Sequence, residues 1–168
     1  MRQSTKGATV LVVLVLAGAW LVRDDRAVDP ARGPVDAPAT TGLLRAASGG
    51  DGDSWKDTSG RAYRLGMVNA PEVGECWSAE ATAARRALIA DGFRADVYAQ
   101  DRYGRGVSLV TAADGTNVNV ALARSGHVDD RYLDDFRHEN RPLAAQLDAA
   151  FSAAKRERAG LWGACAGG

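Results

Sequence analysis

Short runs in which apolar and polar side chains alternate occupy the chain between residues 43 and 119, and turn residues separate the runs. Alternation with a period of two is typical of β-strands that bury one face. The pattern predicts strands at residues 43–47, 54–56, 61–68, 93–99 and 106–111. One helix interrupts them, and we expect Ser78 to cap it and Gly92 to follow its end.

Further along the chain, apolar side chains recur every three or four residues, which is the spacing of one face of a helix. This spacing predicts helical segments at residues 118–125, 132–138 and 143–159. In the last segment Leu143, Leu147 and Phe151 share a face, and Pro142 suits the first helical position. Short strands with one intervening helix and more helices after them fit an α+β fold, a small five-stranded OB-fold barrel with about three helices.

The first 22 residues have the layout of a secretory signal, because Arg2 and Lys6 precede an apolar run from Val10 to Val22. The run is short for a membrane-spanning helix, and residues 17–19 offer a cleavage site of small side chains. The apolar run continues past that site and Arg23 follows it, so an uncleaved membrane anchor is the alternative. Either outcome predicts a secreted or extracytoplasmic protein, tethered to a membrane in the second case.

Residues 23–42 carry three prolines among charged and small side chains and show no apolar periodicity, so we expect a disordered linker there. The folded domain would then comprise residues 43–168, with 16 basic and 17 acidic side chains. A domain with balanced charge has no large basic field for nucleic acid. Such a partner would have to be bound by a local group of residues.

Cys76 and Cys165 are the two cysteines of the chain. The spacings of zinc fingers and iron–sulfur proteins are absent, because those sites need thiolates or imidazoles close together in sequence. Export to an oxidising compartment favours a disulfide, and these residues form the one possible intramolecular pair. We therefore expect a Cys76–Cys165 bond. The alternative, a catalytic thiol, has no histidine close to it in sequence.

Charged residues gather beside glycine and proline in three segments, at residues 51–54, 64–72 and 101–106. Hydrolysis of a phosphodiester requires oxygen ligands for a hard cation, a base that activates water, and cationic groups for the charge on phosphorus. Asp53 and Glu72 can supply the oxygens and the base. Arg64 and Arg105 can each donate two parallel hydrogen bonds to a phosphate. The three segments together therefore favour phosphodiester chemistry over plain turns or surface ion pairs.

The order of these motifs resembles the thermonuclease, or staphylococcal-nuclease-like, family over about residues 43–163. The resemblance rests on Asp51-Gly52-Asp53-Ser54, Arg64-Leu65, Asn69-Ala70-Pro71-Glu72, Asp101-Arg102-Tyr103-Gly104-Arg105, Val118-Asn119 and Gly160-Leu161-Trp162. It implies an OB barrel with three helices. It also implies calcium-dependent cleavage of DNA and RNA that leaves 3′-phosphate ends.

The resemblance implies a role for each matching side chain. The catalytic residues would be Arg64, Glu72 and Arg105, with Glu72 as the general base and the two arginines bound to phosphate. The residues that contact the nucleotide would be Arg102, Tyr103 and Tyr132.

The same resemblance implies a calcium site in which Asp53 is a ligand and Ala70 offers its backbone carbonyl. Where the family usually has a second metal-binding aspartate, this chain has Asn69. An amide oxygen can coordinate calcium but carries no charge, so we expect weaker calcium binding than with aspartate at this position. Acidic residues around Tyr132 should weaken the binding of a polyanion further.

These observations predict an exported, metal-dependent endonuclease that hydrolyses DNA or RNA with low sequence specificity, uses Ca2+ and acts as a monomer. The alternative is a catalytically weakened OB-fold module that only binds nucleic acid. A third reading is a structural surface protein tethered to a membrane. The four side chains Asp53, Arg64, Glu72 and Arg105 favour the first of these.

Overall fold

The computed structural model describes residues 42–165. The expected signal or anchor at residues 1–22 and almost all of the expected linker at residues 23–42 lie outside the described residues. Within residues 42–165, no helix is long and apolar enough to cross a membrane.

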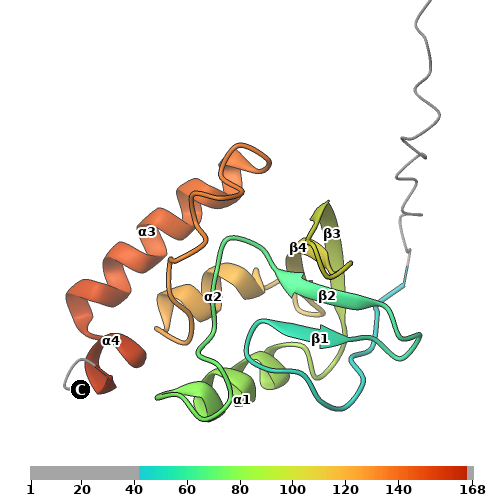
Figure 1. Ribbon diagram of the computed structural model, residues 1–168, viewed down its shortest axis with the longest axis horizontal. Helices are drawn as coiled ribbons and strands as arrows, with labels where there is room; N and C mark the ends of the chain where they lie inside the picture. Colours follow the sequence, from blue (N-terminus) through green and yellow to red (C-terminus); the bar gives the residue numbers. More distant parts are fainter. Residues whose placement is uncertain (1–41, 166–168) are drawn as a thin grey trace, which may run out of the picture. The chain divides into compact units, whose positions relative to one another are not determined.

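Four strands form one mixed sheet in the order β1-β2-β4-β3 (Figure 1). Strands β1 (Ser54–Lys56) and β2 (Ala62–Leu65) make an antiparallel hairpin in which Ser54 lies opposite Arg64. Strand β2 then runs parallel to β4 (Gly106–Ala112), which pairs with β3 (Phe93–Gln100) in antiparallel fashion. These four strands agree with the predicted runs.

The predicted fifth strand at residues 43–47 is wrong, and in the described residues the sheet is open rather than a closed barrel. Leu44 pairs with Phe93 at the start of β3, whereas Ala46 pairs with Asp57 after β1, each as an isolated bridge. The segment thus changes partners after two residues, so neither partner extends into a ladder. The segment still connects the two edge strands, because Leu44 N donates to Phe93 O of β3 at 2.8 Å and Ala47 N donates to Lys56 O of β1 at 2.8 Å.

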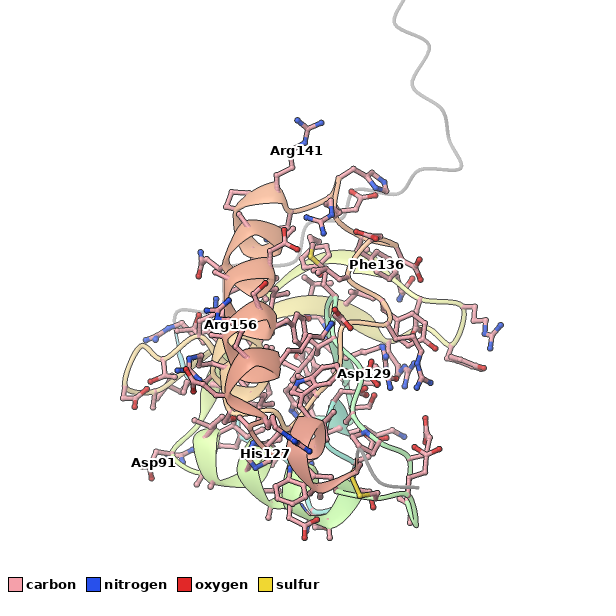
Figure 2. The ribbon with its side chains drawn as sticks, turned by 90° about the vertical axis from the view of Figure 1, so that its left-hand side faces the viewer. Asp91, His127, Asp129, Phe136, Arg141 and Arg156 are labelled. Carbon is pink, nitrogen blue, oxygen red and sulfur yellow. A yellow bond between two sulfur atoms is a disulfide. The ribbon has the colours of Figure 1, made fainter. Side chains whose placement is uncertain are left out.

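Three helices of seven or more residues and one short helix complete the described fold. They are α1 (Ser78–Leu88), α2 (Val118–Arg124), α3 (Arg141–Glu157) and α4 (Leu161–Ala164). Figure 1 shows α2 between α3 and the sheet, and Figure 2 shows Arg141 and Arg156 on α3. The fold is therefore of the α+β class, as predicted.

Two helical predictions are corrected by the structure. Ser78 is the first residue of α1 rather than its cap, because Trp77 occupies the cap position in a left-handed conformation without a side-chain hydrogen bond. Residues 132–138 form turns and no α-helix. Bonds such as Leu133 N to Asp130 O, at 3.0 Å, span three residues there, and the Arg137 side chain binds Asp134 and Asp148. The charged side chains therefore hold this segment against α3 in turns.

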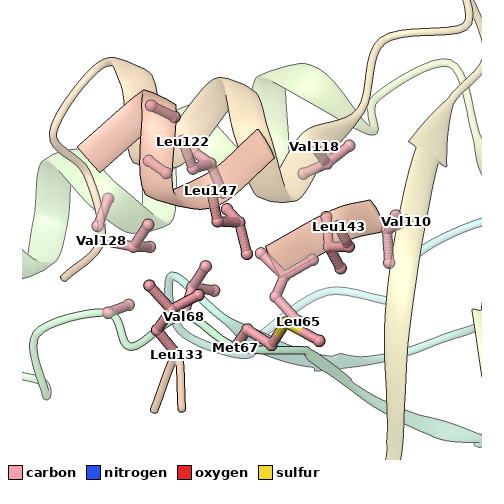
Figure 3. Packing of buried hydrophobic residues seen from close by; sticks show 14 of the residues in the cluster. Leu65, Met67, Val68, Val110, Val118, Leu122, Val128, Leu133, Leu143 and Leu147 are labelled. Atoms are coloured by element: carbon pink, nitrogen blue, oxygen red, sulfur yellow. The ribbon is translucent and has the colours of Figure 1, made fainter. Parts of the chain in front are cut away.

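The core lies between the β2 segment and the helices. Leu65, Met67 and Val68 are buried and face Leu143 and Leu147 of α3 (Figure 3). The periodic apolar face predicted for residues 143–159 is thus the face that α3 buries. Burial on this scale stabilises each large aliphatic side chain by about 1.5–3 kcal/mol relative to exposure.

A buried amide connects α2 to the sheet. Asn119 Oδ1 accepts a hydrogen bond from Val110 N at 2.9 Å, and Nδ2 donates to Gly66 O and Ser108 O at 3.1 and 3.0 Å. Gly66 follows β2 and Ser108 lies in β4, so one side chain bridges the two parallel strands and the helix. The Asn119 side chain therefore fixes the position of β4 beside β2.

The structure contains the predicted disulfide between Cys76 and Cys165, which are 89 positions apart in sequence. Cys165 follows α4 and Cys76 lies in the loop before α1. The bond therefore links the C-terminal segment of the described fold to the loop that also carries Glu72.

Candidate active site

Asp53 lies at the centre of a hydrogen-bonded network just before β1. Its Oδ1 accepts hydrogen bonds from Arg64 Nη1 at 2.7 Å and from Ser54 Oγ at 2.6 Å. Its Oδ2 accepts one from the Ala70 backbone N–H at 2.8 Å. Because Asp53 is 3% exposed, burial raises the pKa of its carboxyl, although Arg64 and the hydrogen bonds act in the opposite direction.

Arg105, the residue just before β4, joins the same network. Its Nη1 donates a hydrogen bond to Ser54 Oγ at 2.9 Å, and Ser54 Oγ in turn donates to Asp53. The antiparallel pairing of Ser54 with Arg64 and the parallel pairing of β2 with β4 bring these residues together. Asp53, Ser54, Arg64 and Arg105, here called the Asp53 network, thus place two guanidinium groups around one carboxylate.

A tight turn between β3 and β4 holds Arg105 in place. Asp101 Oδ1 accepts hydrogen bonds from the backbone N–H of Tyr103 and Arg105, and Oδ2 accepts one from Arg105 Nε at 2.6 Å. Burial alone would raise the pKa of Asp101, but these hydrogen bonds outweigh it and hold the pKa below its usual value. Arg105 Nη1 is thereby left to donate to Ser54 Oγ, at 2.9 Å.

Each arginine of the Asp53 network is covered by a tyrosine ring. The Arg64 guanidinium carbon lies 5.1 Å from the centre of the Tyr132 ring, and that of Arg105 lies 5.3 Å from the centre of the Tyr103 ring. Arg102 also packs on Tyr103, and its Nη2 donates a hydrogen bond to the tyrosine oxygen at 2.6 Å. Both rings are accessible, with Tyr103 67% and Tyr132 36% exposed. The structure therefore brings the three expected nucleotide-contacting residues beside the Asp53 network.

Asn69 is held by a carboxylate that the motif pattern does not single out as part of the site. Asn69 Nδ2 donates a hydrogen bond to Asp129 Oδ2 at 3.2 Å, and the two residues exchange both backbone hydrogen bonds. Asp129 Oδ2 also forms an ion pair with Arg131 Nη2, at 3.5 Å. The site therefore has a carboxylate next to position 69, supplied by the loop after α2 rather than by position 69 itself.

Glu72 does not join the Asp53 network. It lies two residues beyond Ala70 on an exposed loop, and its backbone N–H donates to Glu75 Oε2 at 2.8 Å. Its carboxylate makes no hydrogen bond or ion pair with another of residues 42–165. The proximity of Ala70 to Asp53 thus places the Glu72 loop at the edge of the site and leaves the side chain open to solvent.

The oxygen atoms beside Asp53 are of the kind that calcium prefers. Asp53 Oδ2 accepts a single hydrogen bond, and neither the Asn69 amide oxygen nor the Ala70 carbonyl accepts one from a described residue. Residues 42–165 contain no group of three or more acidic, histidine or cysteine side chains that could hold a metal. The donors present therefore fit a hard cation in type, with Asp53 as the one charged ligand among the expected set.

The chain matches one family of known proteins. Residues 62–164 match the family described as staphylococcal nuclease homologue. The chain belongs to this family. A relative, the succinoglycan biosynthesis protein ExoI of Rhizobium meliloti (strain 1021), is 34% identical over 139 residues, which cover 76% of this chain and 68% of the relative.

Membership of the staphylococcal nuclease family suggests a nuclease-type activity and a nucleic-acid substrate. Arg64, Glu72 and Arg105 lie inside the matched residues, whereas Asp53 precedes them. The hydrogen bonds of Asp53 to Arg64 and Ala70 connect it to the matched region.

A buried arginine binds the backbone of residues 49–51, the loop just before Asp53. The sequence pattern does not reveal it. Arg85 of α1 is 1% exposed; its Nε donates to Asp51 O at 2.9 Å and its Nη2 to Gly49 O at 3.2 Å. Its guanidinium lies over the Trp55 ring at 5.1 Å, and burial lowers its pKa to about 10. In an alanine-rich helix an arginine is normally a surface residue, so only the fold shows that Arg85 holds residues 49–51.

Proposed function

We propose that this protein is a metal-dependent endonuclease that hydrolyses phosphodiester bonds of DNA or RNA, with little sequence specificity and with exposed or single-stranded regions as substrate. The observation that carries this proposal is the meeting of Arg64 and Arg105 around Asp53 through Ser54. Two guanidinium groups linked through Asp53 and Ser54 provide donors for the non-bridging oxygens of one phosphate. The family membership of the chain supports the same reaction class.

Arg64 and Arg105 would bind the scissile phosphate and stabilise the negative charge that grows on its oxygens as a fifth oxygen approaches phosphorus. Glu72 would take a proton from the attacking water while the bond between phosphorus and the leaving oxygen breaks. A calcium ion bound by Asp53, with the Asn69 and Ala70 oxygens beside it, would supply positive charge next to that phosphate. The exposed rings of Tyr103 and Tyr132 can stack on the flanking bases.

We propose that the protein is exported and works as a monomer outside the cytoplasm. The Cys76–Cys165 disulfide supports this location, because such bonds persist in oxidising compartments. The basic and apolar pattern of residues 1–22 supports a signal or an anchor, followed by a linker up to residue 42 and the nuclease domain at residues 43–168.

The second candidate function is a module that binds nucleic acid without cleaving it. It is favoured by the three hydrogen bonds that already occupy the Asp53 carboxylate and by the uncharged amide of Asn69. Digestion of plasmid DNA and of RNA at millimolar calcium, with and without a chelator, separates the two candidates. Cleavage that the chelator abolishes is the expected result, and intact substrate at every calcium concentration would favour the binding module.

Arg105→Ala should lower the rate of single-stranded DNA cleavage by about 10²–10³-fold, because it removes donors aimed at the developing charge on phosphate. Initial rates at saturating DNA measure the effect. Arg94→Ala is the matched control, since Arg94 is an exposed arginine of β3 outside the Asp53 network. Wild-type rates for Arg105→Ala, or an equal loss for Arg94→Ala, would remove Arg105 from the proposed site.

Asn69→Asp should tighten calcium binding and, in the absence of calcium, lower the free energy of unfolding by about 1 kcal/mol or more. The new carboxylate would replace an amide that now donates to Asp129 at 3.2 Å, and two negative charges at that distance repel. Calorimetric calcium titration and urea unfolding measure the two effects. The double variant Asn69→Asp/Asp129→Asn should regain the stability, because it restores one amide and one carboxylate. A calcium affinity equal to that of the wild type in Asn69→Asp would contradict the proposed role of position 69.

A further inference from the structure

We propose that a groove leading away from the Asp53 network binds the sugar–phosphate backbone of a single strand, several nucleotides from the scissile phosphate. This inference rests on the proposed function and names a second contact region for its substrate. The groove consists of two pockets whose linings share Ala47 and Ser48. Its far end carries three arginines, none of which belongs to the Asp53 network.

The near part of the groove is a hollow of about 540 Å³ whose lining includes Ser54 and Arg105. It therefore opens directly onto the Asp53 network, since Arg105 Nη1 binds Ser54 Oγ. Lys56 adds a positive charge to this lining, next to the Trp55 side chain. A nucleic-acid strand with one phosphate bound at Arg105 can continue into this hollow.

The far part of the groove is a hollow of about 410 Å³ lined by Arg45, Arg85 and Arg86, together with residues 46–49 and 89–90. No acidic side chain lines it. Arg45 and Arg86 are exposed and make no ion pair within residues 42–165. Arg85 is buried and holds the Gly49 and Asp51 carbonyls, so it forms the floor of the groove and the other two arginines form its charged side.

The acidic side chains at the near part of the groove are engaged by their own turns. Asp57 Oδ1 accepts hydrogen bonds from Ser59 and from Arg61 N, while Oδ2 accepts one from the Tyr63 hydroxyl. Asp51 Oδ1 accepts the backbone N–H groups of Asp53 and Ser54. These carboxylates therefore accept hydrogen bonds from their own turns. Within residues 42–165, the side chains of Lys56 and Arg86 make no hydrogen bond or ion pair, and that of Arg45 makes one hydrogen bond, from Nη1 to Ala90 O at 3.4 Å.

Two consecutive glycines line the boundary between the two pockets, Gly49 in the far pocket and Gly50 in the near one. Gly49 and Gly50 have φ values of +99° and +76°, a conformation that other residues rarely adopt. A Cβ atom at Gly50 would clash with the Ser54 carbonyl oxygen, so the turn could not keep its shape with a larger residue there. At Gly49 a Cβ would meet nothing within 4 Å, which shows that this part of the boundary is open to solvent. A strand can therefore cross the boundary close to the backbone.

The charge and shape of the groove fit a single-stranded polynucleotide. The chain as a whole has a formal net charge of +0, so attraction over its entire surface is absent and local cationic contacts must supply the affinity. A basic groove that follows the backbone, combined with accessible aromatic rings, is the usual way to bind single strands without sequence preference. The groove supplies the first element, and Tyr103 beside Arg105 supplies the second.

The test compares a labelled 20-nucleotide DNA strand with a 3-nucleotide strand by fluorescence anisotropy, in the Glu72→Gln background so that the probes stay intact. Arg45→Ala/Arg86→Ala should weaken binding of the 20-mer by about tenfold at low salt. It should also reduce the slope of log affinity against log salt by about 1.4, as expected for two lost phosphate contacts. Binding of the 3-mer, which can reach only the Asp53 network, should not change.

Arg94→Ala/Arg156→Ala is the matched control, because it removes two exposed arginines, Arg94 of β3 and Arg156 of α3, that line neither pocket. Figure 2 shows Arg156 on α3. The proposal would be overturned if this control weakened 20-mer binding as much as the groove variant does. It would also be overturned if the groove variant bound the 20-mer with unchanged affinity, or lost as much affinity for the 3-mer as for the 20-mer. Loss of binding to an acidic polysaccharide such as polygalacturonate, with no loss for DNA, would also overturn it and assign the groove to another polyanion. If the protein cleaves no nucleic acid but the groove variant still loses the 20-mer, the proposed function fails while the groove stands.

Discussion

Glu72→Gln is expected to lower the turnover of single-stranded DNA by about 10²–10⁴-fold, which is the contribution of a positioned general base. The fold should not change, because the Glu72 side chain is exposed and its carboxylate makes no hydrogen bond or ion pair within residues 42–165. Initial rates at saturating substrate measure the first effect, and thermal unfolding measures the second. A glutamine has nearly the same shape as the glutamate, so the loss would report the missing basic oxygen rather than a displaced loop.

Glu75→Gln provides the matched control for this experiment. Glu75 lies in the same exposed loop, and its Oε2 accepts the Glu72 backbone N–H at 2.8 Å. Glutamine keeps an oxygen for that hydrogen bond and removes the same charge as the Glu72 substitution. Turnover of Glu75→Gln should therefore stay close to that of the wild type. If both variants lose turnover equally, the loop acts through its charge, and the role of Glu72 as a base is wrong.

The double variant Cys76→Ser/Cys165→Ser is expected to lose about 4–5 kcal/mol of unfolding free energy, the largest stability effect that we predict. The bond closes a loop with a sequence separation of 89, and its loss returns that conformational freedom to the unfolded chain. Since single domains are stable by about 5–15 kcal/mol, this loss would remove a large part of the total. Urea unfolding at equilibrium measures the difference between the variant and the oxidised protein.

Chemical reduction provides an independent check on the disulfide. The reduced wild-type protein should unfold at the same urea concentration as the double variant, because both lack the same cross-link. Leu143→Ala in the core should destabilise the oxidised and the reduced protein by similar amounts, since the Leu143 side chain packs on Leu65 rather than on the disulfide. A difference below about 1 kcal/mol between oxidised and reduced protein would show that the disulfide does not restrict the unfolded chain in this way.

Local patterns in the sequence predicted the elements whose ends carry their own signals. Alternation and turn residues located β3 and β4 at nearly their observed positions, and the apolar spacing located α3, whose Asn140 cap accepts a hydrogen bond from Leu143 N. The patterns were misleading where the partner of a segment is distant. Residues 43–47 have a strand pattern but divide their bonds between two strands, and residues 132–138 have a helix pattern but are held in turns by Arg137.

Two residues of the site region could not have been found from the sequence. Asp129 reads as one of several acidic residues near Tyr132, and only its pairing with Asn69 across 60 positions brings it to the site. Arg85 reads as a surface residue of α1, yet it is almost fully buried under the Asp53 loop. In both cases the location of the side chain depends on how separate elements pack, which the residue type does not predict.

The sequence by itself determined which chemical groups this protein possesses, because the order and spacing of Asp53, Arg64, Glu72 and Arg105 resemble one family, and because its two cysteines allow one intramolecular bond. The tertiary structure decided which of these groups meet. The pairing of β1 with β2 and of β2 with β4 brings Asp53, Arg64 and Arg105 into contact and leaves Glu72 at the edge. Hydrogen bonds between distant segments depend on backbone register and packing, which are properties of the folded chain as a whole rather than of any local stretch of residues.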